Sequence, residues 1–82
     1  MREVTLGEVA EIFGEVIDVS GVEMISGAVL GEDIPVSSNE MLRILSRIQA
    51  RYRFRFDPKE VLGLNTLGDL VETVRLRTSA NH

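Results

Sequence analysis

Few residues of this chain could do chemistry, and nearly all of them carry hydroxyl or carboxylate groups. Its 82 residues include no cysteine, and the single histidine stands at position 82. Without a thiol the chain has neither a thiolate nucleophile nor a cysteine metal site, and one histidine provides neither a two-histidine metal site nor a general base near the other groups. We therefore expect no catalytic residue, no metal site and no enzymatic activity.

Ser37 and Ser38 are the hydroxyls whose position favours chemistry. They precede an amphipathic stretch, and Glu40 follows Ser37 at the spacing of a helix-capping box. Ser37 can therefore cap the helix, which leaves Ser38 beside free backbone N–H groups at the positive end of the helix dipole. An attached phosphodiester is stabilised at such a place. The residues alone leave two interpretations open: both serines only cap the helix, or Ser38 is a modification site.

The elements that must position these serines are helices, because one helix-start signature occurs four times. A small polar residue or an aspartate is followed three positions later by an acid, and apolar residues then recur at helical spacing. The signatures begin at Thr5, Ser37, Asp57 and Thr66. The expected helices span residues 5–18, closed by Gly21; 37 or 38 to 51; 57–62, closed by Gly63; and 66–77, with residues 78–82 frayed.

Residues 19–36 separate the first two helices and contain three glycines and a proline among scattered apolar residues. We expect a long loop, with room for one short helical turn. Its predicted anchors in the core are Val22, Ile25, Leu30 and Ile34. Residues 52–56 alternate like a strand, but no second strand-like segment could pair with them. We therefore expect an extended connection whose aromatic residues fill the core.

These elements predict an all-α fold and a single domain over residues 1–82. The fold would be a bundle of three long helices plus one short helix, with the long loop between the first and second. No apolar run approaches the roughly 20 residues of a membrane span, and no basic-then-hydrophobic signal opens the sequence. We therefore expect a cytoplasmic monomer without a membrane span.

Charge is divided unevenly along the chain. Residues 1–40 hold one positive and nine negative side chains, and residues 41–82 hold eight positive and four negative ones; the sum of −8 and +4 is the net charge of −4. Phosphate would repel the whole molecule, so nucleic acid is disfavoured as a partner. The arginines of the second helix lie opposite its apolar residues, where they form either a solvated face or a docking face for an acidic partner. They are Arg43, Arg47 and Arg51.

The order of residues 30–74 resembles the acyl carrier protein family. Residues 30–39 (LGEDIPVSSN) follow the family's F-x-E-D-L-G-x-D-S-L segment, and residues 66–70 (TLGDL) follow its T-V-G-D-A block. The family's aromatic, fourteen residues after its modified serine, matches Tyr52 counted from Ser38, and Phe54 and Phe56 continue the alternation. Two positions depart from the pattern: Ser37 replaces the usual aspartate and Asn39 the usual leucine.

The resemblance implies an acyl-carrier-like bundle with 4'-phosphopantetheine covalently attached to Ser38. The arm would hold an acyl group as a thioester and present it to lipid or acyl-transfer enzymes. The implied partners are a phosphopantetheinyl transferase and, because the second helix is basic here and usually acidic in the family, acyl-loading and acyl-transfer enzymes with acidic docking faces. The alternatives are an unmodified interaction module that uses its arginine face, and a peptidyl or aminoacyl carrier.

Glu32 and Asp33 form an adjacent acidic pair in the predicted loop, close to the two serines. No histidine or cysteine accompanies them. The resemblance implies that they are the acids that typically flank the attachment site. A contact with a divalent cation is the weaker interpretation.

Overall fold

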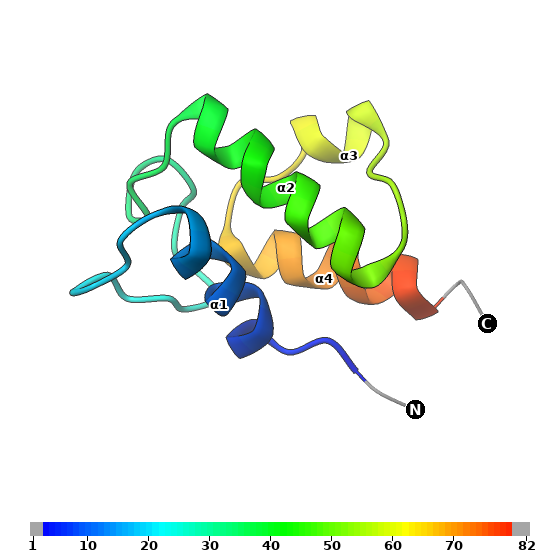
Figure 1. Ribbon diagram of the computed structural model, residues 1–82, viewed down its shortest axis with the longest axis horizontal. Coiled ribbons are helices and arrows are strands. Elements are labelled where there is room, and N and C mark those ends of the chain that lie inside the picture. The colour runs from blue at the N-terminus through cyan, green and yellow to red at the C-terminus, as the bar shows by residue number, and fades with distance from the viewer. Residues whose placement is uncertain (1–2, 80–82) are drawn as a thin grey trace.

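The computed structural model describes residues 3–79, and within them the chain is all-α, as predicted. The helices are α1 (Leu6–Val16), α2 (Ser38–Tyr52), α3 (Pro58–Leu62) and α4 (Leu67–Ser79), and no strand forms among the described residues. Figure 1 shows α3 at the edge of the bundle, beside α2, and the long loop after α1 on the opposite side. The long connection therefore approaches α2 at its start, where the two serines lie.

The helices begin where the capping signatures predict. The Thr5 hydroxyl accepts from the Glu8 N–H at 3.2 Å, and the Glu8 carboxylate accepts from the Thr5 N–H at 3.0 Å. The same exchange joins Thr66 and Asp69 at the start of α4. The N–H groups of Thr66 and Asn65 hold the pKa of Asp69 below its ordinary value. These bonds satisfy N–H groups that the start of a helix leaves unpaired, which explains why short sequence signals locate it.

The helix ends differ from the prediction. α1 ends at Val16 and not near Asp18, because the Asp18 carboxylate accepts the N–H of Ser20 at 2.9 Å and stabilises a turn instead. Gly21 lies in that turn with φ 75° and does not cap α1. At the other end of the chain, the predicted fraying is wrong for residues 78–79, which are helical; residues 80–82, including His82, lie outside the described residues.

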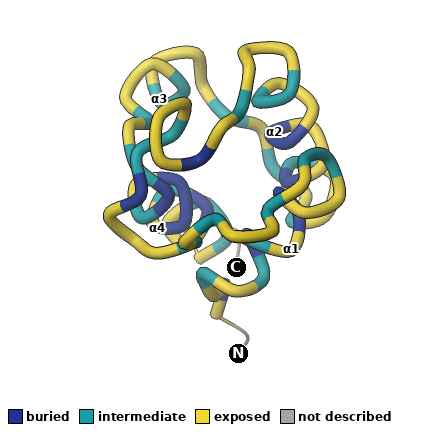
Figure 2. Tube along the Cα trace, turned by 90° about the vertical axis from the view of Figure 1, so that its left-hand side faces the viewer, coloured by how far each residue is buried: buried dark blue, intermediate teal, exposed yellow. Residues whose placement is uncertain are grey.

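The core forms where α1, α2 and α4 face one another, and Figure 2 shows buried residues along the inner sides of these helices. Phe13, Ile44 and Leu70 are fully buried examples, one from each helix. α3 contributes no buried residue. Phe54 and Phe56 lie in the extended connection before α3 and pack against the core as predicted, with ring centroids 4.8 Å apart. Tyr52 also packs there, as the last residue of α2.

The long loop forms no helix but contains one helical turn, where the Asp33 N–H donates to the Val29 carbonyl at 2.9 Å. Backbone hydrogen bonds attach the loop to the start of α4. Leu30 N–H donates to the Asn65 carbonyl at 2.9 Å, and Leu67 N–H donates to the Ala28 carbonyl at 2.9 Å. Gly68 N–H donates to the Ser26 carbonyl at 2.8 Å. These bonds satisfy polar groups that the loop would otherwise bury unpaired.

The side chains that anchor this loop differ in part from the expected set. Ile34 is fully buried, and Val22 and Leu30 pack against the core, as predicted. Ile25 is 54% exposed, so its predicted anchoring role is wrong. Ala28 is buried instead, because the backbone bonds to α4 draw the loop inward at that position.

Substitution of Gly68 by alanine should weaken the attachment of the loop. A Cβ atom at this position would lie 2.8 Å from the Ser26 carbonyl oxygen, so the loop would have to shift. We expect a loss of about 1–3 kcal/mol in the free energy of unfolding, measured by urea denaturation. Gly14→Ala is the matched control, because its Cβ would meet Val19 at an ordinary 3.7 Å. That variant should gain up to about 1 kcal/mol from helix propensity. Equal stability of the two variants would contradict the close approach at Gly68.

Candidate functional site

The two serines at the start of α2 have different roles. Ser37 is the N-cap: its hydroxyl accepts from the Glu40 N–H at 3.2 Å, and the Glu40 carboxylate accepts from the Ser37 N–H at 2.8 Å. Ser38 is the first helical residue and is exposed. Its hydroxyl makes no hydrogen bond with another residue in the range 3–79. The capping bonds are therefore complete without Ser38, and its hydroxyl remains accessible.

The backbone around Ser38 favours a negatively charged substituent. The N–H groups of Ser38 and Asn39 lie in the first turn, where no preceding turn supplies an acceptor. α2 has fifteen residues, and its aligned peptide dipoles place partial positive charge at this end. A phosphate attached to Ser38 would therefore lie close to unpaired donors and to the favourable end of the helix.

An apolar hollow of about 250 Å³ opens beside Ser38. Three segments form its walls: the end of the long loop, the first two turns of α2, and the residues around the end of α3. The lining residues are Leu30, Gly31, Val36, Ser37, Ser38, Met41, Leu45, Val61 and Leu64. Apart from the two serines its side chains are apolar, so the hollow suits a hydrocarbon group better than a polar ligand.

Two exposed leucines lie close to this hollow in the sequence. Leu42 is 61% exposed and lies one turn beyond Ser38 on the same side of α2. Leu62, next to the lining residue Val61, is 87% exposed. Neither leucine was among the residues predicted from the sequence to form a site, and helical periodicity does not distinguish them from core residues. They add exposed apolar surface to α2 and α3 outside the hollow.

The three arginines predicted as a partner-binding face are exposed on α2, as expected. Arg47 donates to Glu15 of α1 at 3.1 Å, with both side chains about half exposed. A hollow of about 360 Å³ between α1 and α2 is lined by Arg47 and Arg51, together with Ile12, Glu15 and Ala50. This arrangement leaves Arg43 and Arg51 without a carboxylate partner among the described residues.

The arginines and Ser38 lie on different sides of α2. A helix turns about 100° per residue, so Arg43 projects roughly 140° away from Ser38 around the axis. Arg51 lies thirteen residues after Ser38, or roughly 20 Å along the axis. The structure brings Ser38 together with the apolar hollow, whereas the arginines face α1 and the surrounding solvent.

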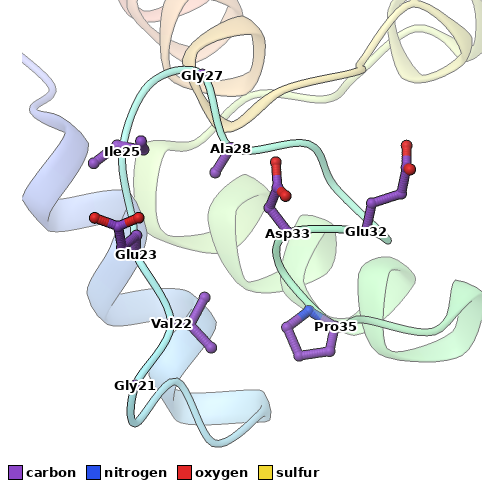
Figure 3. A pocket seen from close by; sticks show the side chains of 9 residues that line it. All are labelled: Gly21, Val22, Glu23, Ile25, Gly27, Ala28, Glu32, Asp33 and Pro35. Carbon is purple, nitrogen blue, oxygen red and sulfur yellow. The ribbon is translucent and has the colours of Figure 1, made fainter.

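The acidic pair in the loop has a structural explanation for one member. The Asp33 carboxylate accepts the N–H of Val29 at 2.9 Å, and Glu32 is exposed. Both line a further hollow of about 480 Å³ with Glu23. Figure 3 shows that the carboxylates of Glu23, Glu32 and Asp33 lie separate from one another and do not converge on one point. Residues 3–79 contain no group of three acids, cysteines or histidines placed to hold a metal ion, so the cation interpretation gains no support.

Comparisons of this chain with protein-family models, curated proteins and solved structures give no significant match. The resemblance to acyl carrier proteins therefore remains a prediction from the sequence. In addition, none of the helices between residues 3 and 79 is long and apolar enough to cross a membrane.

The division of roles between the serines predicts different effects on stability. Ser37→Ala removes the side-chain cap of α2 and should lower the free energy of unfolding by about 1 kcal/mol. Ser38→Ala removes an exposed hydroxyl and should change it by less than about 0.5 kcal/mol. Urea denaturation of both variants measures the difference. A larger loss for Ser38→Ala would mean that Ser38 is the cap.

Proposed function

We propose that this protein is a specialised acyl carrier with an acyl-carrier-like bundle and with 4'-phosphopantetheine covalently attached to Ser38. One observation carries the proposal: Ser38 is an exposed hydroxyl that the helix does not need for capping, and it lies at the mouth of an apolar hollow. A carrier needs both features, an accessible attachment point and a shelter for its cargo. The protein itself would catalyse no reaction.

The residues around Ser38 fit the proposed group. The Ser38 oxygen would attack the pantetheine-linked phosphorus of coenzyme A and lose its proton; the phosphodiester forms as the pyrophosphate bond breaks and adenosine 3',5'-bisphosphate leaves. The N–H groups of Ser38 and Asn39 would stabilise the negative charge of the attached phosphate. When bound, phosphopantetheine would supply the thiol that carries the acyl group as a thioester, because the chain has no cysteine. The protein's part is to hold the arm beside the hollow.

The hollow would shelter the acyl chain from water. Leu45, Val61 and Leu64 offer apolar contacts on two sides of it. Each methylene group that moves from water into such surroundings contributes about 0.8 kcal/mol. The hollow has a volume of about 250 Å³, and no side chain that lines it is charged. Both observations support a hydrocarbon cargo.

The arginines of α2 favour partner enzymes with acidic docking faces. A phosphopantetheinyl transferase and enzymes that load or transfer acyl groups would have to approach Ser38. Arg43 and Arg51 have no carboxylate partner among residues 3–79 and lie on a different side of α2 from Ser38. An enzyme at Ser38 would therefore meet this complementary charge with an acidic docking face that extends around the helix. Arg47 would contribute less, because Glu15 already neutralises it.

A second candidate function is an unmodified interaction module, and the same arginine face favours it, since that face requires no modification of Ser38. A peptidyl or aminoacyl carrier would use Ser38 in the same way and differ only in its cargo. The modification state therefore separates the second candidate from both carriers.

Incubation of the purified protein with coenzyme A and a broad-specificity phosphopantetheinyl transferase tests the attachment. The intact mass should rise by one phosphopantetheinyl group, and Ser38→Ala should abolish the gain. Ser37→Ala is the matched control and should keep the gain, because its hydroxyl serves only the cap. If instead Ser37→Ala abolishes the gain and Ser38→Ala does not, the site is the neighbouring serine. No gain in any protein would favour the interaction module.

Charge reversal on α2 tests partner selectivity. A malonyl transferase of the fatty-acid type, which docks through basic patches, should transfer poorly to the modified wild-type protein. Arg43→Glu and Arg51→Glu should each raise the rate at low salt, and the gain should shrink as salt screens the charges. Arg55→Glu is the matched control, since it reverses an exposed charge off this face. An equal effect of all three variants would show that only net charge matters.

A further inference from the structure

Arg77 of α4 makes four contacts with the short helix α3 and the segment that leads into it. Its guanidinium lies 2.7 Å from the Glu60 carboxylate and 3.5 Å from that of Asp57. It also donates to the Arg55 carbonyl at 2.9 Å and lies 5.7 Å from the centre of the Phe54 ring. An arginine can make these contacts together because its planar group offers several donors and a face that stacks on aromatic rings.

Few other contacts hold α3 in place. It has five residues, none of them buried, and Leu62 is 87% exposed. Val61 and the following Leu64 pack only partly against the core, at the hollow beside Ser38. A further bond holds the preceding connection, where the Phe56 N–H donates to the Gln49 side chain at 2.9 Å. Segments with so few buried contacts open at lower free energy than the core does.

We propose that α3 is a movable wall of the hollow beside Ser38, and that Arg77 is the positioning residue that latches this wall to α4. Release of Arg77 frees the N-terminal part of α3, because its contacts join the N-cap residue Asp57, Glu60 within α3, and the carbonyl of Arg55 in the preceding segment. Val61 and Leu64 would then move away from the Ser38 side, and the hollow would open. The use of this motion to admit an acyl chain rests on the proposed function, whereas the latch itself does not.

The charges around Arg77 predict how its contact with Glu60 depends on pH. The N–H of Asp57, desolvation and Arg77 act on Glu60, and the net effect holds the pKa of Glu60 below its ordinary value. A carboxylate with a lowered pKa stabilises the folded arrangement near neutral pH and loses this contribution as acid protonates it. Lys59, Asp69 and Glu72 line the same surface hollow as Glu60 and also set the local field. The latch should therefore remain closed at neutral pH.

The absence of cysteine from the chain makes thiol accessibility a direct test. Val61→Cys places a single thiol on the hollow side of α3, and Val9→Cys places one in the core, where only global unfolding exposes it. Each is combined with Arg77→Gln, and the rate of reaction with a thiol reagent is measured at neutral pH. We expect Arg77→Gln to speed the reaction at position 61 about three- to tenfold, with little change at position 9.

Two controls make the result specific to the latch. Arg75→Gln removes an arginine on the same helix that donates to the Val4 carbonyl at 2.7 Å, and it should leave the rate at position 61 unchanged. Arg77→Lys keeps a charge for Glu60 but loses the forked geometry, and it should give an intermediate rate. Equal acceleration at positions 61 and 9, or none at position 61, would overturn the proposal. The test needs no modified Ser38, so its failure is separate from failure of the proposed function.

Discussion

The attachment of the long loop to the start of α4 is the constraint from which the arrangement of the site follows. A connection of this length must pair its backbone groups when it passes over a core. Here residues 26–30 do so with residues 65–68 by hydrogen bonds of 2.8–2.9 Å. The crossing places Leu30 and Gly31 beside the start of α2, where they become one wall of the hollow. It also buries Ala28 and Ile34 over the core that α1, α2 and α4 share.

The remaining properties of the site come from the start of α2 and from the weak attachment of α3. Ser37 and Glu40 complete the cap, so Ser38 can be accessible without a cost to the helix. α3 is too short to bury a face of its own, and the space between it and α2 remains a hollow. A capped helix start and a short helix without buried residues thus lie on two sides of the hollow, an arrangement that suits the proposed carrier function.

The starts of the helices, and therefore the position of Ser38, could be predicted from local signals in the sequence. Helix starts depend on side chains three positions apart, so Thr5, Ser37 and Thr66 could be identified without tertiary information. Helix ends and loop anchors depend on long-range contacts. The exposure of Ile25 follows from the crossing with α4, which no periodicity encodes. The Glu15–Arg47 ion pair joins residues 32 positions apart, and the sequence pattern only showed that the two halves carry opposite charge.

We propose that Ser38 and the hollow beside it form one site for an arm-borne acyl chain. The direct measurement compares backbone amide NMR shifts of the phosphopantetheinylated protein with and without an octanoyl group on the arm. We expect shift changes at residues that line the hollow from three separate segments, Leu30, Met41, Val61 and Leu64, and little change at Arg43 or Arg51. Shifts confined to Ser38 and its sequence neighbours, or centred on the hollow between α1 and α2, would contradict the proposal.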